Sequence, residues 1–242
     1  MAGSPRRWGP PDQPAAASRW WLAVEVRCAD RLTKRAGPQV RHHAAVAVLQ
    51  ILAVVGYSGF LVVVFGWRTL QTKRSTGESR WREPVSATDA VGETVCLVGC
   101  LLSLLAAPLA LAGTVAPLWT GWVGARGAAG ALALALGTGL AIWAQHHLAD
   151  EWRAGVEASA SLVMGGPFAR VRNPFYLGCF LASASVLAAV PSVVALAGLA
   201  LHVVAAEIIV RGVEEPILAE AHGDSFVRYT RRTGRFLPRR GT

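Results

Sequence analysis

Long runs of apolar sequence without a formal charge constrain this chain more than any other feature. Residues 44–67, 94–120 and 127–148 contain no Asp, Glu, Lys or Arg. A helix needs about 20 apolar residues to cross a bilayer, because unpaired backbone groups are not tolerated in hydrocarbon. The runs therefore predict three transmembrane helices. Only 16% of all residues are charged, against about 25% in a soluble domain.

A fourth and a fifth apolar segment come as a pair. Residues 174–190 and 193–210 are interrupted only by Pro191 and Ser192. Proline disfavours helix at the preceding residue, so the pair predicts a tight helical hairpin with its tip at Pro191. The first arm is short for a full crossing. We expect an all-α, polytopic membrane helix bundle of about five transmembrane helices, or of four with a re-entrant hairpin.

The remaining segments suggest a three-part organisation. Residues 1–43 are basic and rich in proline, with a tail typical of disorder and a possible interfacial helix around Trp20 and Trp21. Residues 44–148 hold three spans. Residues 149–242 hold the hairpin, 174–211, followed by C-terminal helices. Polar stretches at 71–89 and 150–160 are predicted loops.

The formal net charge of +9 is carried mostly by arginine. These arginines flank the apolar runs, so anionic lipid headgroups are the expected partners rather than nucleic acid. The C-terminal tail is rich in arginine and the hairpin tip has none, which predicts a cytoplasmic C-terminus. Basic residues are balanced on the two sides of the first span and leave the N-terminus undecided. Composition rich in Ala, Gly and Arg suggests a GC-rich bacterial source and a bacterial plasma membrane.

A polar stripe follows the second arm of the hairpin. Glu207, Arg211, Glu214 and Leu218 are spaced four, three and four residues apart and would share one face of a continuous α-helix. An acid, a base and an acid at the membrane boundary suit a zwitterionic ligand. A surface ladder of ion pairs is the alternative.

A second polar segment precedes the first arm. Gly165, Gly166 and Pro167 form a turn signal, Asn173 is placed to cap a helix, and Pro174 suits its first turn. Arg170 and Arg172 lie where free N–H groups also favour an anion. The alternative is a membrane re-entry turn whose arginines bind headgroups.

The two segments together resemble the isoprenylcysteine carboxyl methyltransferase and phospholipid methyltransferase superfamily. That superfamily has the pattern G-P-[YF]-x-x-V-R-[HN]-P-x-Y-x-G, a hairpin, E-E-x-x-L, a glycine and spaced aromatics. The resemblance covers about residues 152–238. The matching positions are Gly166, Pro167, Phe168, Val171, Arg172, Pro174, Tyr176, Gly178, Glu214, Glu215, Leu218, Gly223, Phe226, Tyr229 and 235–238.

The resemblance implies an S-adenosyl-L-methionine-dependent methyltransferase whose cofactor site lies at the cytoplasmic end of the hairpin. It assigns Glu214 to the ammonium group of the cofactor, and Arg211 to orienting an anionic group of the acceptor. The remaining implied cofactor contacts are Ser161, Leu162, Val163, Phe168, Arg172, Asn173, Pro174, Phe175 and Tyr176. The expected acceptor is lipophilic or small: an isoprenylcysteine-like carboxylate, a thiol or a lipid amine.

Two positions depart from the superfamily pattern. Asn173 replaces the commoner histidine, and asparagine cannot be protonated. Pro216 follows the glutamate pair and lacks a backbone N–H, so it is expected to kink the helix and re-aim Glu215. The effect of Pro216 on Glu215 favours Glu214 as the functional glutamate.

Other readings of the chain remain open. A membrane sterol-reductase-like enzyme would bind NADPH, and a non-catalytic membrane scaffold would need no cofactor. We expect no metal site: Cys96 and Cys100 resemble buried small apolar residues, and the adjacent His146 and His147 point apart on a helix. His202 is expected either to line an acceptor tunnel or to form a hydrogen bond between helices.

Overall fold

The computed structural model describes residues 37–67, 69–70, 84–148 and 162–239, and this part of the chain consists of helices and loops without a strand. The chain divides into two compact units, Met1–Ala45 and Val46–Thr242, and the second is described below. Its principal helices are α2 (Pro38–Leu61), which begins in the first unit, α4 (Ala87–Leu111), α5 (Val123–Leu148), α7 (Pro174–Ala189) and α8 (Val193–Ile209). The predicted all-α bundle is confirmed.

Within the described residues, four helical segments are long and apolar enough to cross a membrane: Pro38–Gly66, Ala87–Leu111, Val123–Leu148 and Val193–His222. α7 has only 16 residues, which at about 1.5 Å per residue gives about 24 Å, less than the roughly 30 Å of a hydrocarbon core. More than half of its residues are buried, whereas the other helices expose many leucines and valines. Such exposed apolar faces suit a lipid environment.

The ends of the first two spans differ from those predicted. α2 begins at Pro38 rather than at residue 44. α4 begins at Ala87, inside the predicted loop 71–89, because the Ser86 side chain caps it by accepting from the Asp89 N–H at 3.1 Å. It ends at Leu111, although the charge-free run continues to residue 120. Apolar composition alone does not distinguish a membrane helix from an apolar loop.

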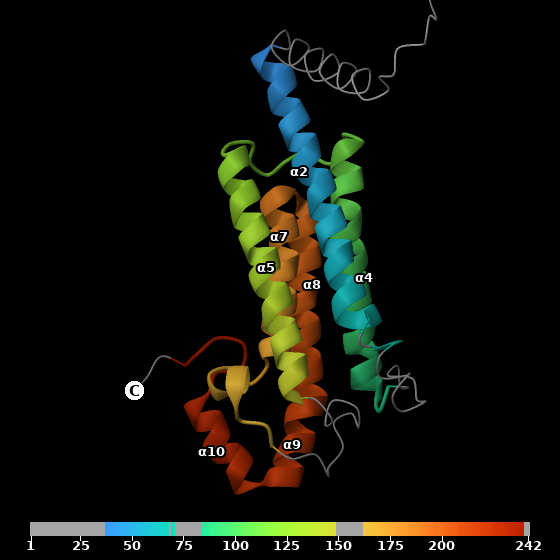
Figure 1. The fold of residues 1–242 in the computed structure, drawn as a ribbon. Coiled ribbons are helices and arrows are strands. Elements are labelled where there is room, and N and C mark those ends of the chain that lie inside the picture. Colours follow the sequence, from blue (N-terminus) through green and yellow to red (C-terminus); the bar gives the residue numbers. More distant parts are fainter. Residues whose placement is uncertain (1–36, 68, 71–83, 149–161, 240–242) are drawn as a thin grey trace, which may run out of the picture. The chain divides into compact units, whose positions relative to one another are not determined.

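The predicted hairpin is present, with its tip at Val190, Pro191 and Ser192 (Figure 1). The Ser192 hydroxyl accepts from the Ala195 N–H at 3.2 Å and starts α8. The loop after α4 lies at the same end, since the Leu118 N–H donates to the Pro191 carbonyl at 2.7 Å.

Glycines bring α5 close to α7 and α4 close to α8. A Cβ on Gly178 of α7 would lie 2.7 Å from the Gly137 carbonyl oxygen of α5, and a Cβ on Gly198 of α8 would lie 3.0 Å from the Ser103 backbone nitrogen of α4. Membrane helices associate through such small-residue contacts because lipid supplies no hydrophobic driving force between them. This packing places the last turns of α5 and α8 and the first turn of α7 together at the end of the bundle opposite the hairpin tip.

The predicted interfacial helix near residue 20 and the loop 150–160 lie outside the described residues.

Candidate active site

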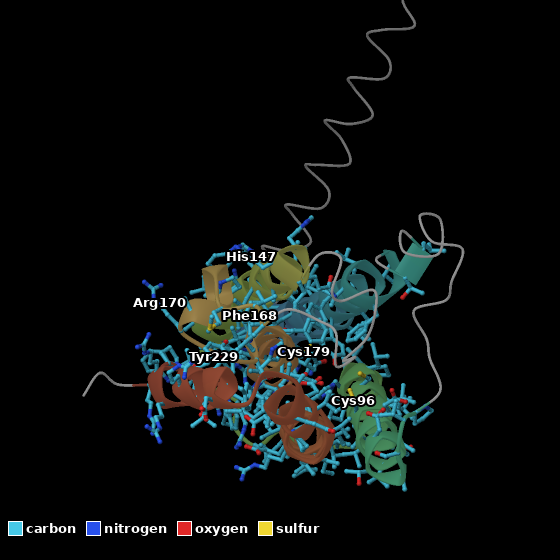
Figure 2. The ribbon with its side chains drawn as sticks, turned by 90° about the horizontal axis from the view of Figure 1, so that it is seen from below. Cys96, His147, Phe168, Arg170, Cys179 and Tyr229 are labelled. Atoms are coloured by element: carbon cyan, nitrogen blue, oxygen red, sulfur yellow. The ribbon has the colours of Figure 1, made fainter. Side chains whose placement is uncertain are left out.

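The end of the hairpin opposite the tip, where α7 begins and α8 ends, is called the hairpin mouth below. Its first wall is the short 3-10 helix η2 (Gly166–Ala169). Gly166 has φ +54° and packs against the His147 ring, where a Cβ would collide. Phe168 is buried, and its carbonyl accepts from the Tyr229 hydroxyl at 2.7 Å. Figure 2 shows Phe168 and Tyr229 on neighbouring elements.

The C-terminal segment is hydrogen-bonded to the residues that lead into α7. Val171 and Gly234 form an isolated parallel bridge, and the Arg172 N–H donates to the Gly234 carbonyl at 2.8 Å. Asn173 donates to the Arg235 carbonyl from its backbone at 3.0 Å and from its side chain at 3.3 Å. Asn173 occupies the N-cap position as predicted, but its side chain makes no cap hydrogen bond. Its amide is used to hold the C-terminal segment instead.

The second wall is formed where α8 ends. The helix continues as a π-helical turn, η3 (Val210–Glu214), and then as α9 (Glu215–His222) and α10 (Asp224–Arg232). The Glu215 N–H donates to the Val210 carbonyl, five residues back. Pro216 directly follows and offers no N–H, so a regular α-helical ladder is interrupted here. A π turn accommodates an extra residue.

This π turn overturns the predicted helical face. A continuous α-helix would place Glu214 beside Glu207 and Arg211. With the extra residue, Glu215 takes that place: the Arg235 guanidinium lies 3.6 Å from Glu207 Oε2 and 2.6 Å from Glu215 Oε2. Glu214 turns toward α7. Pro216 was expected to re-aim Glu215, and the π turn brings Glu215 to the same arginine, Arg235, as Glu207.

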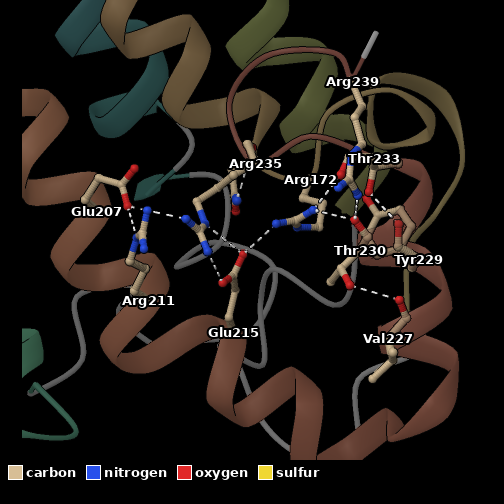
Figure 3. Close-up of polar contacts among 11 residues, drawn as sticks. Arg172, Glu207, Arg211, Glu215, Val227, Tyr229, Thr230, Thr233, Arg235 and Arg239 are labelled. Carbon is tan, nitrogen blue, oxygen red and sulfur yellow. Dashed lines mark hydrogen bonds and ion pairs between the residues drawn. The ribbon is translucent and has the colours of Figure 1, made fainter. Parts of the chain in front are cut away.

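Glu215 is the centre of an ion cluster (Figure 3). Arg235 contacts both of its carboxylate oxygens, at 2.9 and 2.6 Å, and Arg172 contacts Oε1 at 3.1 Å. Arg172 also donates to the Thr233 carbonyl at 2.6 Å and the Thr230 carbonyl at 3.2 Å. Hydrogen bonding to Glu215 raises the pKa of Arg235 above its usual value. The cluster connects the segment before α7, the start of α9 and the C-terminal segment.

Glu214 faces the start of α7. The Tyr176 hydroxyl donates to Glu214 Oε1 at 2.8 Å, and both residues are half-buried. The Tyr176 ring packs edge-on against Phe175 and Phe236 at centroid distances of 5.8 and 6.3 Å. The tyrosine that holds this carboxylate is therefore itself held by two phenylalanine rings.

The other predicted residues are placed as follows. Pro174 and Phe175 are buried in the first turn of α7, and Leu162 and Val163 are half-buried in the segment before η2. The Arg211 side chain is 62% exposed and is ion-paired with Glu207, so it lies at the rim. Ser161 lies outside the described residues.

Residues 125–225 match the family model described as phospholipid methyltransferase. The match runs from α5 through the hairpin, η3 and α9, and so contains both walls of the hairpin mouth. This part of the chain is similar to that family, which falls within the superfamily that the motifs resemble. Among curated proteins, no significant match to the chain is found.

Sequence reasoning missed the bridging role of Glu215 and its partner Arg235. Pro216 was the sequence feature that pointed to both, because it predicts a break in the α-helical register. It does not predict which way the residues before it are rotated. Tyr229 was noted only as a motif aromatic, and its bond to the Phe168 carbonyl connects residues 61 positions apart.

Proposed function

We propose that the protein transfers a methyl group from S-adenosyl-L-methionine to a lipophilic or small acceptor at the hairpin mouth. The observation that carries the proposal is the bond between Tyr176 and Glu214, which holds a half-buried carboxylate at the start of the hairpin. The family match supplies the reaction class.

The residues of the hairpin mouth suit a zwitterionic donor. Glu214 offers an anionic acceptor for an ammonium group. Arg172 has a buried Nε–H without an acceptor in the described part of the chain, and a ligand carboxylate would supply one. Asn173 is half-buried beside them. Leu162, Val163 and Phe168 offer an apolar wall for an adenosine group.

S-adenosyl-L-methionine supplies an electrophilic methyl group on a sulfonium, and its transfer needs little acid–base help. The protein's part is to fix the donor and align the acceptor at about 3–3.5 Å. The ion cluster around Glu215 keeps Arg172 in place, and the rings of Phe175, Tyr176 and Phe236 exclude water. The exposed Arg211 at the rim is proposed to orient an anionic group of the acceptor.

The distribution of arginines supports a cytoplasmic hairpin mouth. Among the described arginines of the second unit, Arg126 lies at the tip end, whereas the mouth end carries Arg170, Arg172, Arg211, Arg228, Arg231, Arg232, Arg235 and Arg239. An open depression of about 450 Å³ at that end is lined by Arg172, Arg231, Arg235 and Arg239 among others. We propose that anionic lipid headgroups bind there.

The test is binding of labelled S-adenosyl-L-methionine, with NADPH as the competing probe, to detergent-purified protein. The parent should bind the methyl donor saturably. Glu214→Ala should weaken binding at least about tenfold, since loss of a charged hydrogen bond costs about 1.5–3 kcal/mol.

Glu220→Ala is the matched control, because Glu220 is an exposed glutamate on the same segment. Equal affinity in Glu214→Ala and Glu220→Ala would remove Glu214 from the site. Binding of NADPH alone would assign the chain to the reductases, and binding of neither by folded protein would favour the scaffold.

A further inference from the structure

A second polar cluster lies inside the bundle, on elements different from those of the hairpin mouth. It contains Cys96 and Cys100 of α4 and His202 of α8, whose potential ligand atoms all lie within 4.8 Å of one another. Cys100 Sγ lies 3.3 Å from His202 Nε2. The Tyr57 hydroxyl of α2 lies 3.3 Å from the same nitrogen and 3.9 Å from Cys100 Sγ.

The hydrogen bonds of His202 fix which nitrogen faces the cluster. Nδ1 lies 2.7 Å from the Gly198 carbonyl oxygen, which can only accept. Nδ1 therefore carries the proton in the neutral ring, and Nε2 presents its lone pair to Cys100 and Tyr57. Metal-binding histidines characteristically donate their other ring N–H to a backbone carbonyl in this way. The Ser183 hydroxyl, 3.2 Å from Nδ1, also holds the ring.

We propose that Cys96, Cys100 and His202 bind a thiophilic metal ion, Zn²⁺, with Tyr57 completing the coordination. Ligands at about 2.0–2.3 Å from a tetrahedral zinc lie roughly 3.3–3.8 Å apart. Cys100 and His202 already have that separation, and the longest separation in the cluster needs to close by only about 1 Å to reach it.

The charge of the ligand set favours a divalent ion. Zn²⁺ binding releases the two thiol protons to solvent, and the two thiolates, a neutral imidazole and the Tyr57 hydroxyl with its proton retained make the complex neutral. Uncompensated charge is expensive at this depth of a membrane protein. Cu(I) with two thiolates would leave one negative charge, so zinc is the better fit to this buried position, although thiolates bind both ions.

The site would link α4 to α8 next to the Gly99–Gly198 contact. Close approach of these backbones is what brings the ring of His202 to α4, because a Cβ on Gly99 would lie 3.1 Å from His202 Nδ1. The inference does not depend on the proposed methyl transfer, which uses other side chains.

The test is metal binding by the full-length protein in a Cys28→Ser background, stripped with a chelator and titrated with Co²⁺ as a spectroscopic probe for zinc. We expect about one ion per chain, with thiolate-to-cobalt charge-transfer absorption that Zn²⁺ abolishes. Cys100→Ser and His202→Gln should each weaken binding at least about tenfold. Titration of Cu(I) alone in a separate sample distinguishes the two ions.

Cys179→Ser is the matched control, because Cys179 is a buried cysteine of α7 outside the cluster. It should bind Co²⁺ like the parent. Since a cluster variant can fail to fold, the melting temperature of the parent is compared with and without Zn²⁺, and it should rise on loading. The proposal is overturned if folded parent binds no stoichiometric Co²⁺, if Cys100→Ser binds it like Cys179→Ser, or if only Cu(I) binds.

Discussion

Glu215→Ala is expected to destabilise the hairpin mouth, because it leaves the guanidinium groups of Arg172 and Arg235 without their shared carboxylate. Arg235 contacts the Glu215 carboxylate at 2.6 and 2.9 Å, and Arg172 contacts it at 3.1 Å. The exposed fraction of the side chain is 23% for Arg235, 12% for Arg172 and 19% for Glu215. Removing one partner of a buried pair costs about 3–5 kcal/mol. Partial exposure of these groups reduces this to about 2–4 kcal/mol.

The assay is thermal unfolding in detergent, followed by tryptophan fluorescence. For a chain of this size about 1 kcal/mol shifts the melting temperature by about 2–4 °C, so we expect a fall of roughly 5–15 °C. Glu220→Ala should change it by less than about 2 °C, because an exposed substitution usually costs under about 0.5 kcal/mol.

A double-mutant cycle identifies the cause. If Glu215→Ala acts by leaving Arg235 uncompensated, adding Arg235→Ala should cost about 1–3 kcal/mol less than the sum of the single effects. Additive effects in the cycle, or equal melting temperatures for Glu215→Ala and Glu220→Ala, would refute the reasoning that the cluster holds the hairpin mouth together.

Three smaller predictions concern packing, a buried hydroxyl and a cap. Gly178→Ala should lower stability by about 1–3 kcal/mol through overpacking. Gly139→Ala should be neutral or slightly stabilising, because no atom lies within 4 Å of a Cβ added there. Equal melting temperatures for the two variants would contradict this prediction. Tyr229→Phe should cost about 1 kcal/mol with loss of the bond to the Phe168 carbonyl. Burial raises the pKa of Tyr229 from 10.0 to about 12, so the stabilising effect of this hydroxyl is complete below pH 10 and is lost as the pH rises through 12. Ultraviolet titration of the parent, compared with Tyr229→Phe, measures that pKa. A midpoint near 10 for Tyr229 would contradict the prediction. Ser192→Ala should cost about 0.5–2 kcal/mol as a lost N-cap, measured by the same unfolding assay, and no change would show that the hairpin tip does not depend on this cap.

The membrane bundle could be predicted because the spans are a property of composition. Charge-free runs longer than a bilayer crossing specify membrane helices whatever their neighbours are, and Pro191 with Ser192 marked the hairpin tip. The ends of α4 could not be predicted in the same way. Ser86 caps the helix within a predicted loop, and the helix stops at Leu111 inside an apolar run, so local hydrogen bonding decides both ends.

The site was only partly predictable. The motif segments correctly indicated that η2 and the first turn of α7 meet the end of α8, because the arms of a hairpin bring sequence-distant ends together. The choice between the two glutamates depended on helical register. A continuous α-helix puts Glu214 beside Glu207, and the π turn puts Glu215 there, which sequence periodicity cannot show.

The sequence by itself determined the fold class, the hairpin and the two motif segments on either side of it, since these depend on local composition and spacing along the chain. Only the tertiary structure decided which side chains meet. Cys100 and His202 are 102 positions apart, and Arg172 and Glu215 are 43 apart. Their contacts exist because glycines let helix backbones approach and because a π turn rotates one carboxylate, and neither distance nor rotation is encoded in a local pattern.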